Sequence, residues 1–120
     1  MKKINDYWKL FTSCFLIIFS ILFSNGASGQ IEAYHFNAGW NDANGVKWFM
    51  DLEDCKTKGI VDIAKNPDQA QKHKIAVVPT IIIFKDGEEA LRFQADLSFK
   101  MVATKEEVQE AIDELLMSDF

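Results

Sequence analysis

The run from Val77 to Phe84 is the most apolar stretch of the chain beyond its first thirty residues. A short run of this kind is typical of a strand with both faces covered, inside an α/β sheet. Asp86-Gly87 follows it, and residues 90–95 then resume an extended alternation. Because Asp-Gly is a preferred pair in two-residue turns, the sequence predicts an antiparallel hairpin here.

Helical and extended segments surround this hairpin. Residues 31–36 and 59–63 predict short strands, and apolar spacing predicts a helix over about residues 42–54. A second helix is expected from Pro67, with Asn66 as its cap, to about His73. The capping box at residues 104–107 opens a last helix. Because helical crossovers join the first three strands, we expect these three to be parallel.

The length and charge of the chain narrow its class. Its 120 residues suit one domain, and 26% of them are charged. Residues 1–29 hold three lysines and one aspartate, so residues 30–120 carry 10 basic and 17 acidic side chains, a net charge of −7. An acidic domain without a stripe of Lys and Arg is a poor candidate for binding nucleic acid or an anionic membrane.

The N-terminal segment, residues 1–29, resembles a secretory signal peptide. Basic residues at positions 2, 3 and 9 precede an apolar run over residues 10–23, and small residues at 27–29 predict cleavage before Gln30. The alternative is an uncleaved membrane anchor facing the outside, since about 20 apolar residues span a bilayer. We therefore predict an exported domain over residues 30–120, in the periplasm or outside the cell.

Cysteine usage follows from that prediction. Cys14 leaves with the signal peptide, so the mature chain keeps only Cys55 and forms no internal disulfide. A lone exposed thiol is a liability in an oxidising compartment, which favours a buried Cys55 that acts as a small apolar side chain. The alternative is a reactive thiol at Cys55.

The stretch from Phe36 to Asn44 lies where the first strand meets the first predicted helix. Exposed N–H groups and side chains collect at such an end of an open sheet, where α/β proteins usually place their sites. The stretch resembles the thioredoxin active-site pattern Phe-x-Ala-x-Trp-Cys-x-x-Cys. Phe36, Ala38 and Trp40 match it, whereas Asn41 and Asn44 stand in place of the two cysteines.

Further segments extend this resemblance to thioredoxins over about residues 31–116. They are Asn66-Pro67, Val78-Pro79-Thr80 and Lys85-Asp86-Gly87. The resemblance implies a minimal thioredoxin fold, an α/β domain with a four-stranded mixed sheet in the order βαβαββα, flanked by three helices. The extra N-terminal strand and helix of thioredoxins are absent, and the first helix-to-strand stretch is shorter than theirs.

The resemblance also shows which chemistry is missing. Thiol–disulfide exchange needs a thiolate at a helix N-terminus and a second cysteine one turn later. The carboxamides of Asn41 and Asn44 do not ionise near neutral pH, and His35 stands where the family has a buried acid. We expect no catalytic residue among these degenerate positions. Capping explains Asn41, Asp42 and Asn44 better than a cation site does, so no metal or cofactor is predicted.

The remaining candidate residues are two histidines with an expected structural role and four residues of an expected binding groove. A histidine on a central strand, such as His35, is more often packed and hydrogen-bonded than a base or a metal ligand, and His73 is expected at the surface. The resemblance implies a cis bond at Pro79 and a peptide-binding groove of Trp40, Val78, Pro79 and Thr80.

Three functional hypotheses follow. The leading one is an exported, redox-inactive adaptor, chaperone-like protein or subunit whose partner is a protein or peptide, with membrane contact only if residues 1–29 remain. The second is an enzyme of redox homeostasis that uses the thiol of Cys55. The third is a purely structural domain.

Overall fold

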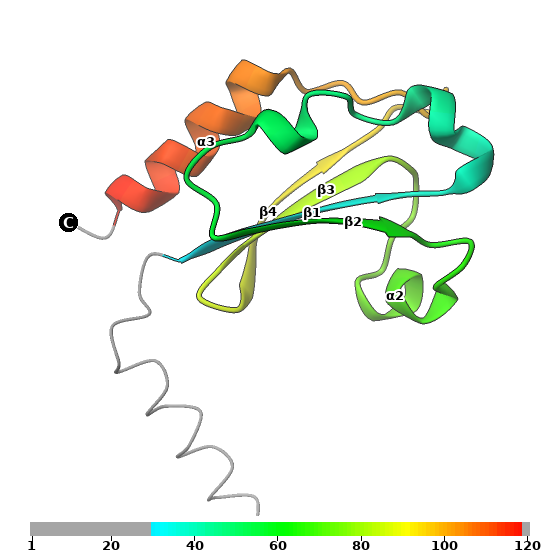
Figure 1. Ribbon diagram of the computed structural model, residues 1–120, viewed down its shortest axis with the longest axis horizontal. Helices are drawn as coiled ribbons and strands as arrows, with labels where there is room; N and C mark the ends of the chain where they lie inside the picture. The colour runs from blue at the N-terminus through cyan, green and yellow to red at the C-terminus, as the bar shows by residue number, and fades with distance from the viewer. Residues whose placement is uncertain (1–29, 119–120) are drawn as a thin grey trace, which may run out of the picture.

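The computed structural model describes residues 30–118 (Figure 1). The predicted signal peptide over residues 1–29 lies outside these residues. One four-stranded mixed sheet, in the order β2-β1-β3-β4, forms the centre of the described part. Its strands are β1 (Ile31–Asn37), β2 (Thr57–Asp62), β3 (Thr80–Lys85) and β4 (Glu88–Gln94). The helical elements are the 3₁₀ helices η1 (Gly39–Asn44) and η2 (Phe49–Asp51) and the α-helices α2 (Pro67–Lys72) and α3 (Lys105–Met117).

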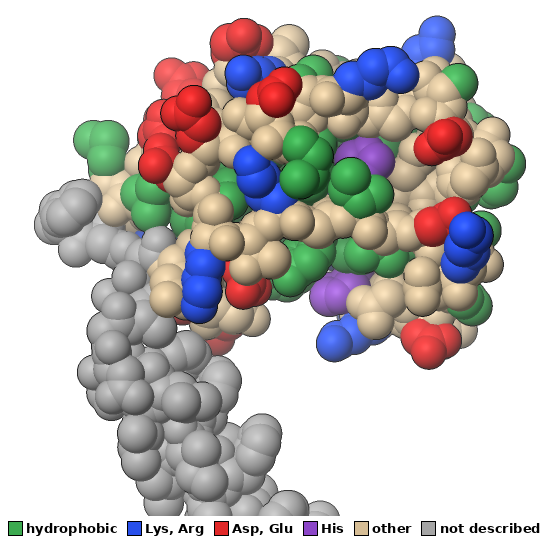
Figure 2. Space-filling model, in the orientation of Figure 1, with side chains coloured by type: hydrophobic (Ala, Val, Ile, Leu, Met, Phe, Trp, Pro, Cys, Tyr) green, Lys and Arg blue, Asp and Glu red, His purple; other side chains and the backbone are tan. Residues whose placement is uncertain are grey.

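The main core lies between the sheet and α3, which Figure 1 shows on one side of the sheet with α2 on the other. Alternate residues of β1 and β3 face α3 because side chains change sides along a strand. The buried core cluster consists of Ile31, Ala33, Phe49, Leu52, Ile81, Ile83, Val108 and Ile112. Acidic side chains gather over the outer side of α3 (Figure 2). Within residues 30–118, no helix has both the length and the apolar character needed to cross a membrane.

The predicted capping box at the start of α3 is confirmed. The backbone N–H of Glu107 donates to the Thr104 hydroxyl at 3.1 Å, and the N–H of Thr104 donates to the Glu107 carboxylate at 2.8 Å. These two bonds satisfy amide groups that the helix itself leaves unpaired. The start of α3 is therefore set by local sequence.

The predicted parallel direction of the third strand is wrong. β1 pairs with β2 in parallel, but β3 runs antiparallel to β1. The cause is the length of α2, whose six residues span only about 9 Å at 1.5 Å per residue. A strand of six residues spans about 20 Å, so α2 cannot carry the chain back along the sheet. The chain enters β3 at the end where it left β2.

The predicted helix over residues 42–54 is also wrong, because η1 and η2 stand in its place. η1 ends at Gly45, whose backbone is extended with φ −61° and ψ 153°. The next amide, that of Val46, donates to Nε2 of His35 at 3.1 Å and not to a carbonyl four residues earlier. An α-helical hydrogen-bond ladder therefore does not start.

The apolar spacing that predicted this helix instead reflects which residues of η2 and its flank face the core. Phe49 and Leu52 are buried in the core, whereas Met50 is 51% exposed. A separation of three residues places two side chains on one side of a 3₁₀ turn as well as of an α-helix. The spacing therefore identified the core residues Phe49 and Leu52 but was wrong for Met50 and for the type of helix.

Gly59 of β2 is set by a close contact on the opposite side of the sheet from α3. A Cβ atom at this position would lie 2.7 Å from Cε1 and 2.8 Å from Cδ1 of the Tyr34 ring. The variant Gly59→Ala is expected to displace that ring and to lower the free energy of unfolding by about 1–3 kcal/mol. Urea denaturation measures this loss. Gly87→Ala is the control, because no atom lies within 4 Å of a Cβ there and the strain comes from the backbone φ of +88°. Only Gly59→Ala should displace the Tyr34 ring and so change the near-UV tyrosine signal.

Candidate functional site

The carboxyl end of β1 leads into η1, where the side chain of Asn41 is buried. Its Nδ2 donates to Oδ1 of Asn37 at 3.1 Å and to the carbonyl of Phe99 at 3.2 Å, and the carbonyl of Val78 lies 3.5 Å away. Its Oδ1 accepts from Nδ2 of Asn44 at 2.9 Å. One carboxamide thus joins β1, η1, the loop before β3 and the loop after β4.

The backbone around Asn41 departs from a helix. Asn41 has φ −112° and ψ 21°, outside the helical region, within a 3₁₀ segment of six residues. The N–H of Asn41 donates to the carbonyl of Ala38 at 2.8 Å, and that of Gly45 donates to the carbonyl of Asp42 at 3.0 Å. The site therefore lacks the aligned α-helical N-terminus that lowers the pKa of a thiol.

Of the three degenerate positions, Asn41 bonds to Asn37 and to Asn44, and His35 lies near Asn37 at Gly45. Nδ2 of Asn37 donates to the carbonyl of Asn41 at 3.1 Å. A Cβ atom at Gly45 would lie 3.5 Å from Nδ2 of Asn37 and 3.9 Å from Cε1 of His35. The sequence did not indicate a role for Asn37, which is the last residue of β1 and exchanges two hydrogen bonds with Asn41.

The side chain of His35 is buried. Its Nε2 accepts from the N–H of Val46, its ring lies 5.4 Å from that of Phe49, and Nδ1 is buried without a hydrogen-bond partner in the described residues. Burial lowers the pKa of His35, and the carboxylate of Asp42 opposes this only in part. The ring is packed and holds the backbone between η1 and η2.

The lowered pKa of His35 predicts a loss of stability in acid. Below the ordinary pKa, about 6.5, the unfolded chain binds a proton that the folded chain resists, so stability falls as pH drops from about 6.5 towards the lowered value. The limiting slope for one such group is about 1.4 kcal/mol per pH unit. Urea denaturation between pH 7.5 and 5 should show this fall, and His35→Gln should show a smaller one. His73, whose pKa burial also lowers, gives the matched variant His73→Gln. Equal slopes in wild type and His35→Gln would contradict the prediction.

An exposed aromatic pair lies beside these buried side chains. The rings of Trp40 and Phe99 meet edge to face, with centroids 5.2 Å apart and an interplanar angle of 87°. Trp40 is 67% exposed and Phe99 is 40% exposed. Together with Ile63 and residues 75–78 they line a hollow of about 120 Å³, which we call the Trp40 hollow.

Of the four predicted groove residues, only Trp40 and Val78 line the Trp40 hollow. Pro79 and Thr80 are buried, and the peptide bond between Val78 and Pro79 is cis. The Thr80 hydroxyl donates to the carbonyl of Val77 at 2.6 Å. The sequence prediction missed Phe99, which no spacing links to Trp40.

Cys55 lies at the other end of the sheet. It precedes β2, and the N–H of its neighbour Lys56 donates to the carbonyl of Ile31, the first residue of β1, at 2.7 Å. Trp40 follows the end of β1, and seven residues of strand span about 20 Å. Cys55 is half-buried against the core, and burial raises the pKa of its thiol. It therefore lies far from the Trp40 hollow.

Within residues 30–118, no group of three or more His, Cys, Asp or Glu side chains could hold a metal ion. The amides of Asn41 and Asn44 are hydrogen-bonded to each other, and Asp42 is exposed.

The sheet order β2-β1-β3-β4, with helices on both sides, is that of a thioredoxin-like α/β fold. A mutant thioredoxin from Halobacterium salinarum NRC-1 superposes with a TM-score of 0.56 at 18% identity, over 72% of this chain and 75% of its own. The Malassezia sympodialis thioredoxin Mala s 13 gives 0.55 at 22% identity, over 74% and 77%. Fasciola hepatica thioredoxin gives 0.51 at 21%, over 75% and 85%.

One curated relative adds similarity of sequence. Thioredoxin Y1, chloroplastic, from Arabidopsis thaliana is 45% identical over 42 residues, which are 35% of this chain and 24% of that protein. The match thus spans about a quarter of the relative's length. No protein-family model matches the chain. The comparisons establish the thioredoxin-like fold.

Proposed function

We propose that this protein is an exported thioredoxin-like domain that does not exchange disulfides and that binds an extended segment of a partner protein at the Trp40 hollow. The observation that carries the proposal is the buried Asn41 carboxamide, hydrogen-bonded on both its nitrogen and its oxygen. A catalytic thiol must be free to attack and to leave. In place of such a thiol, this position holds a side chain that fixes four segments together.

Two further features support the absence of exchange chemistry. Asn44 cannot resolve a mixed disulfide, because a carboxamide has no nucleophilic sulfur. Cys55 lies at the far end of the sheet, and the raised pKa of its thiol leaves little thiolate at neutral pH. Export is proposed from the apolar segment over residues 1–29.

The binding half of the proposal depends on exposed apolar and backbone groups. Trp40 and Phe99 expose aromatic surface that could be buried against an apolar partner side chain, and aromatic anchors of this kind dominate many interfaces. Within residues 30–118, the N–H groups of Val77 and Val78 have no hydrogen-bond acceptor. An extended peptide could accept from them as an added strand would.

An insulin-reduction assay with dithiothreitol tests the first half. The mature protein should not accelerate insulin precipitation above the dithiothreitol background. A rate clearly above background, abolished in Cys55→Ser, would instead assign redox chemistry to Cys55. Labelling of Cys55 by a thiol reagent should be slow in the folded protein and fast after urea is added.

A comparison of two exposed apolar residues tests the second half. Trp40→Ala should lose the proteins that wild type captures from a cell-envelope extract. Met50→Ala, in η2 and 51% exposed, should keep them. Equal capture by both variants would remove the Trp40 hollow from the proposal and favour a structural domain.

A further inference from the structure

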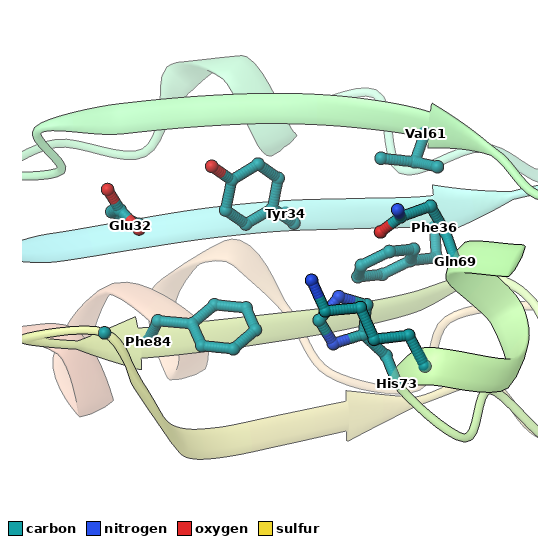
Figure 3. A pocket seen from close by; sticks show the side chains of 9 residues that line it. Glu32, Tyr34, Phe36, Val61, Gln69, His73 and Phe84 are labelled. Atoms are coloured by element: carbon teal, nitrogen blue, oxygen red, sulfur yellow. The ribbon is translucent and has the colours of Figure 1, made fainter. Parts of the chain in front are cut away.

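The face of the sheet opposite α3 contains a second hollow, of about 350 Å³. β1, β2 and β3 form its floor, and α2 covers only one end of it, because α2 has six residues (Figure 3). Tyr34, Phe36 and Phe84 project from the strands and His73 from the end of α2. We call this space the aromatic hollow. It shares no lining residue with the Trp40 hollow.

Four rings of the aromatic hollow form a closed circuit. Tyr34 contacts Phe84 at 5.8 Å and Phe36 at 6.5 Å between ring centroids. His73 contacts Phe36 at 5.2 Å and Phe84 at 5.6 Å. These separations lie in the range of favourable aromatic pairs, so each ring is held by two others. Gly59 lets the Tyr34 ring lie against β2, where a larger residue would displace it.

Two opposite charges line the aromatic hollow. Glu32 lies on β1, two residues before Tyr34 on the same side of the strand, and pairs across the sheet with Phe84. Lys72 is the last residue of α2, next to His73, whose ring contacts Phe36. Neither charged side chain has a hydrogen-bond or ion-pair partner in the described residues. Burial lowers the pKa of His73, which favours the uncharged form of its ring.

Glu32 lies near the start of β1, whereas Lys72 extends from the end of α2, which covers only one end of the hollow. Glu32 and Phe36 are four residues apart on β1, which corresponds to about 13 Å along a strand. A ligand with one charge would leave the opposite charge at the other end without a partner. A ligand with a positive group, an apolar body and a negative group matches all three parts of the lining.

We propose that the aromatic hollow binds a short zwitterionic peptide of two or three apolar residues, with its ammonium at Glu32 and its carboxylate at Lys72. The hollow has a volume within the usual range of small-ligand sites. Three extended residues span about 10 Å, and the flexible side chain of Lys72 covers the remaining distance. The ligand's side chains contact the four rings. This site is independent of the proposed function at the Trp40 hollow.

Calorimetric titration of the protein, purified as cells produce it, with the tripeptide Leu-Gly-Phe tests the proposal. Wild type should bind the free tripeptide. Acetylation of the peptide N-terminus should weaken binding about threefold or more, and so should amidation of its C-terminus. Glu32→Gln should abolish the effect of acetylation alone, and Lys72→Gln the effect of amidation alone. The matched variants Glu110→Gln and Lys47→Gln, on exposed positions elsewhere, should behave as wild type.

Because neither Glu32 nor Lys72 has a partner within residues 30–118, both variants should keep the wild-type circular dichroism and melting curve. Trp40→Ala should bind the tripeptide as wild type does, so failure of one proposal is distinguishable from failure of the other. Absence of saturable binding, or equal affinity for free and blocked peptides, would overturn the proposal. So would a stable dimer, seen by sedimentation, that dissociates in Tyr34→Ala, because a second copy would then occupy the hollow.

Discussion

A variant with cysteine at both positions 41 and 44 is expected to reduce insulin disulfides at least about tenfold more slowly than a thioredoxin at pH 7. Residue 41 is buried and lies in a 3₁₀ segment with non-helical dihedral angles, so a thiol there gains little from a helix dipole. A thiol with an ordinary pKa of about 8.5 is only about 3% ionised at pH 7, whereas a pKa near 7 gives about half. Burial would lower the ionised fraction further.

Direct titration of the new thiol by its thiolate absorbance separates this explanation from misfolding. The pKa of the cysteine at position 41 should lie at or above about 8.5, in a variant that keeps the wild-type near-UV spectrum. The single variant Asn44→Cys gives the control for a thiol at the partly buried neighbouring position. A pKa near 7 together with thioredoxin-like activity would contradict the prediction. It would show that the two missing sulfurs alone separate this domain from a reductase.

The second large effect is expected from Asn41→Leu, which should lower the free energy of unfolding by about 3 kcal/mol. The substitution removes the donor to Asn37 and Phe99 and the acceptor for Asn44. Each buried polar partner left unsatisfied costs about 1–3 kcal/mol. Asn66→Leu is the matched control, because Asn66 is exposed and makes one side-chain bond, to the carbonyl of Asp62 at 3.0 Å. It should cost less than about 1 kcal/mol, and equal losses in urea denaturation would refute the structural role of Asn41.

Strands and the last helix could be predicted from local sequence because local physics determines them. The run of Ile81, Ile82 and Ile83 is buried on both sides, and the turn at Asp86-Gly87 has the positive φ values, 54° and 88°, that such a pair tolerates. The capping box fixes the start of α3. The approximate positions of the strands, the hairpin turn and the start of α3 were therefore predictable, whereas the direction of β3 was not.

The two errors in the predicted fold have different causes, the short length of α2 and a hydrogen bond that interrupts the first predicted helix. The direction of β3 depends on the length of α2. The order of predicted elements contains no information on that length. The missing first helix depends on one long-range bond, in which His35 takes the amide of Val46. Apolar spacing contains no information on a hydrogen bond that joins residues eleven apart.

The candidate site was predictable in its residues and not in its interactions. The sequence indicated His35, Trp40, Asn41 and Asn44 from the resemblance to thioredoxins. It could not indicate the part played by Phe99, which lies 58 residues from Asn41 in the chain. The carbonyl of Phe99 accepts a hydrogen bond from Asn41, and its ring contacts Trp40. His73 was expected at the surface, but it lies half-buried between two phenylalanine rings. Contacts of this kind arise only when distant loops meet.

The short α2 has a consequence for heat resistance. Part of the sheet lacks the covering layer that would otherwise bury its rings, so the isolated domain forgoes some of the apolar burial that a longer helix would provide. A molecule that binds in the aromatic hollow binds only the folded chain. By mass action, the melting temperature then rises with the concentration of that molecule. The melting temperature of this domain should thus depend on which small molecules are present in solution and at what concentration.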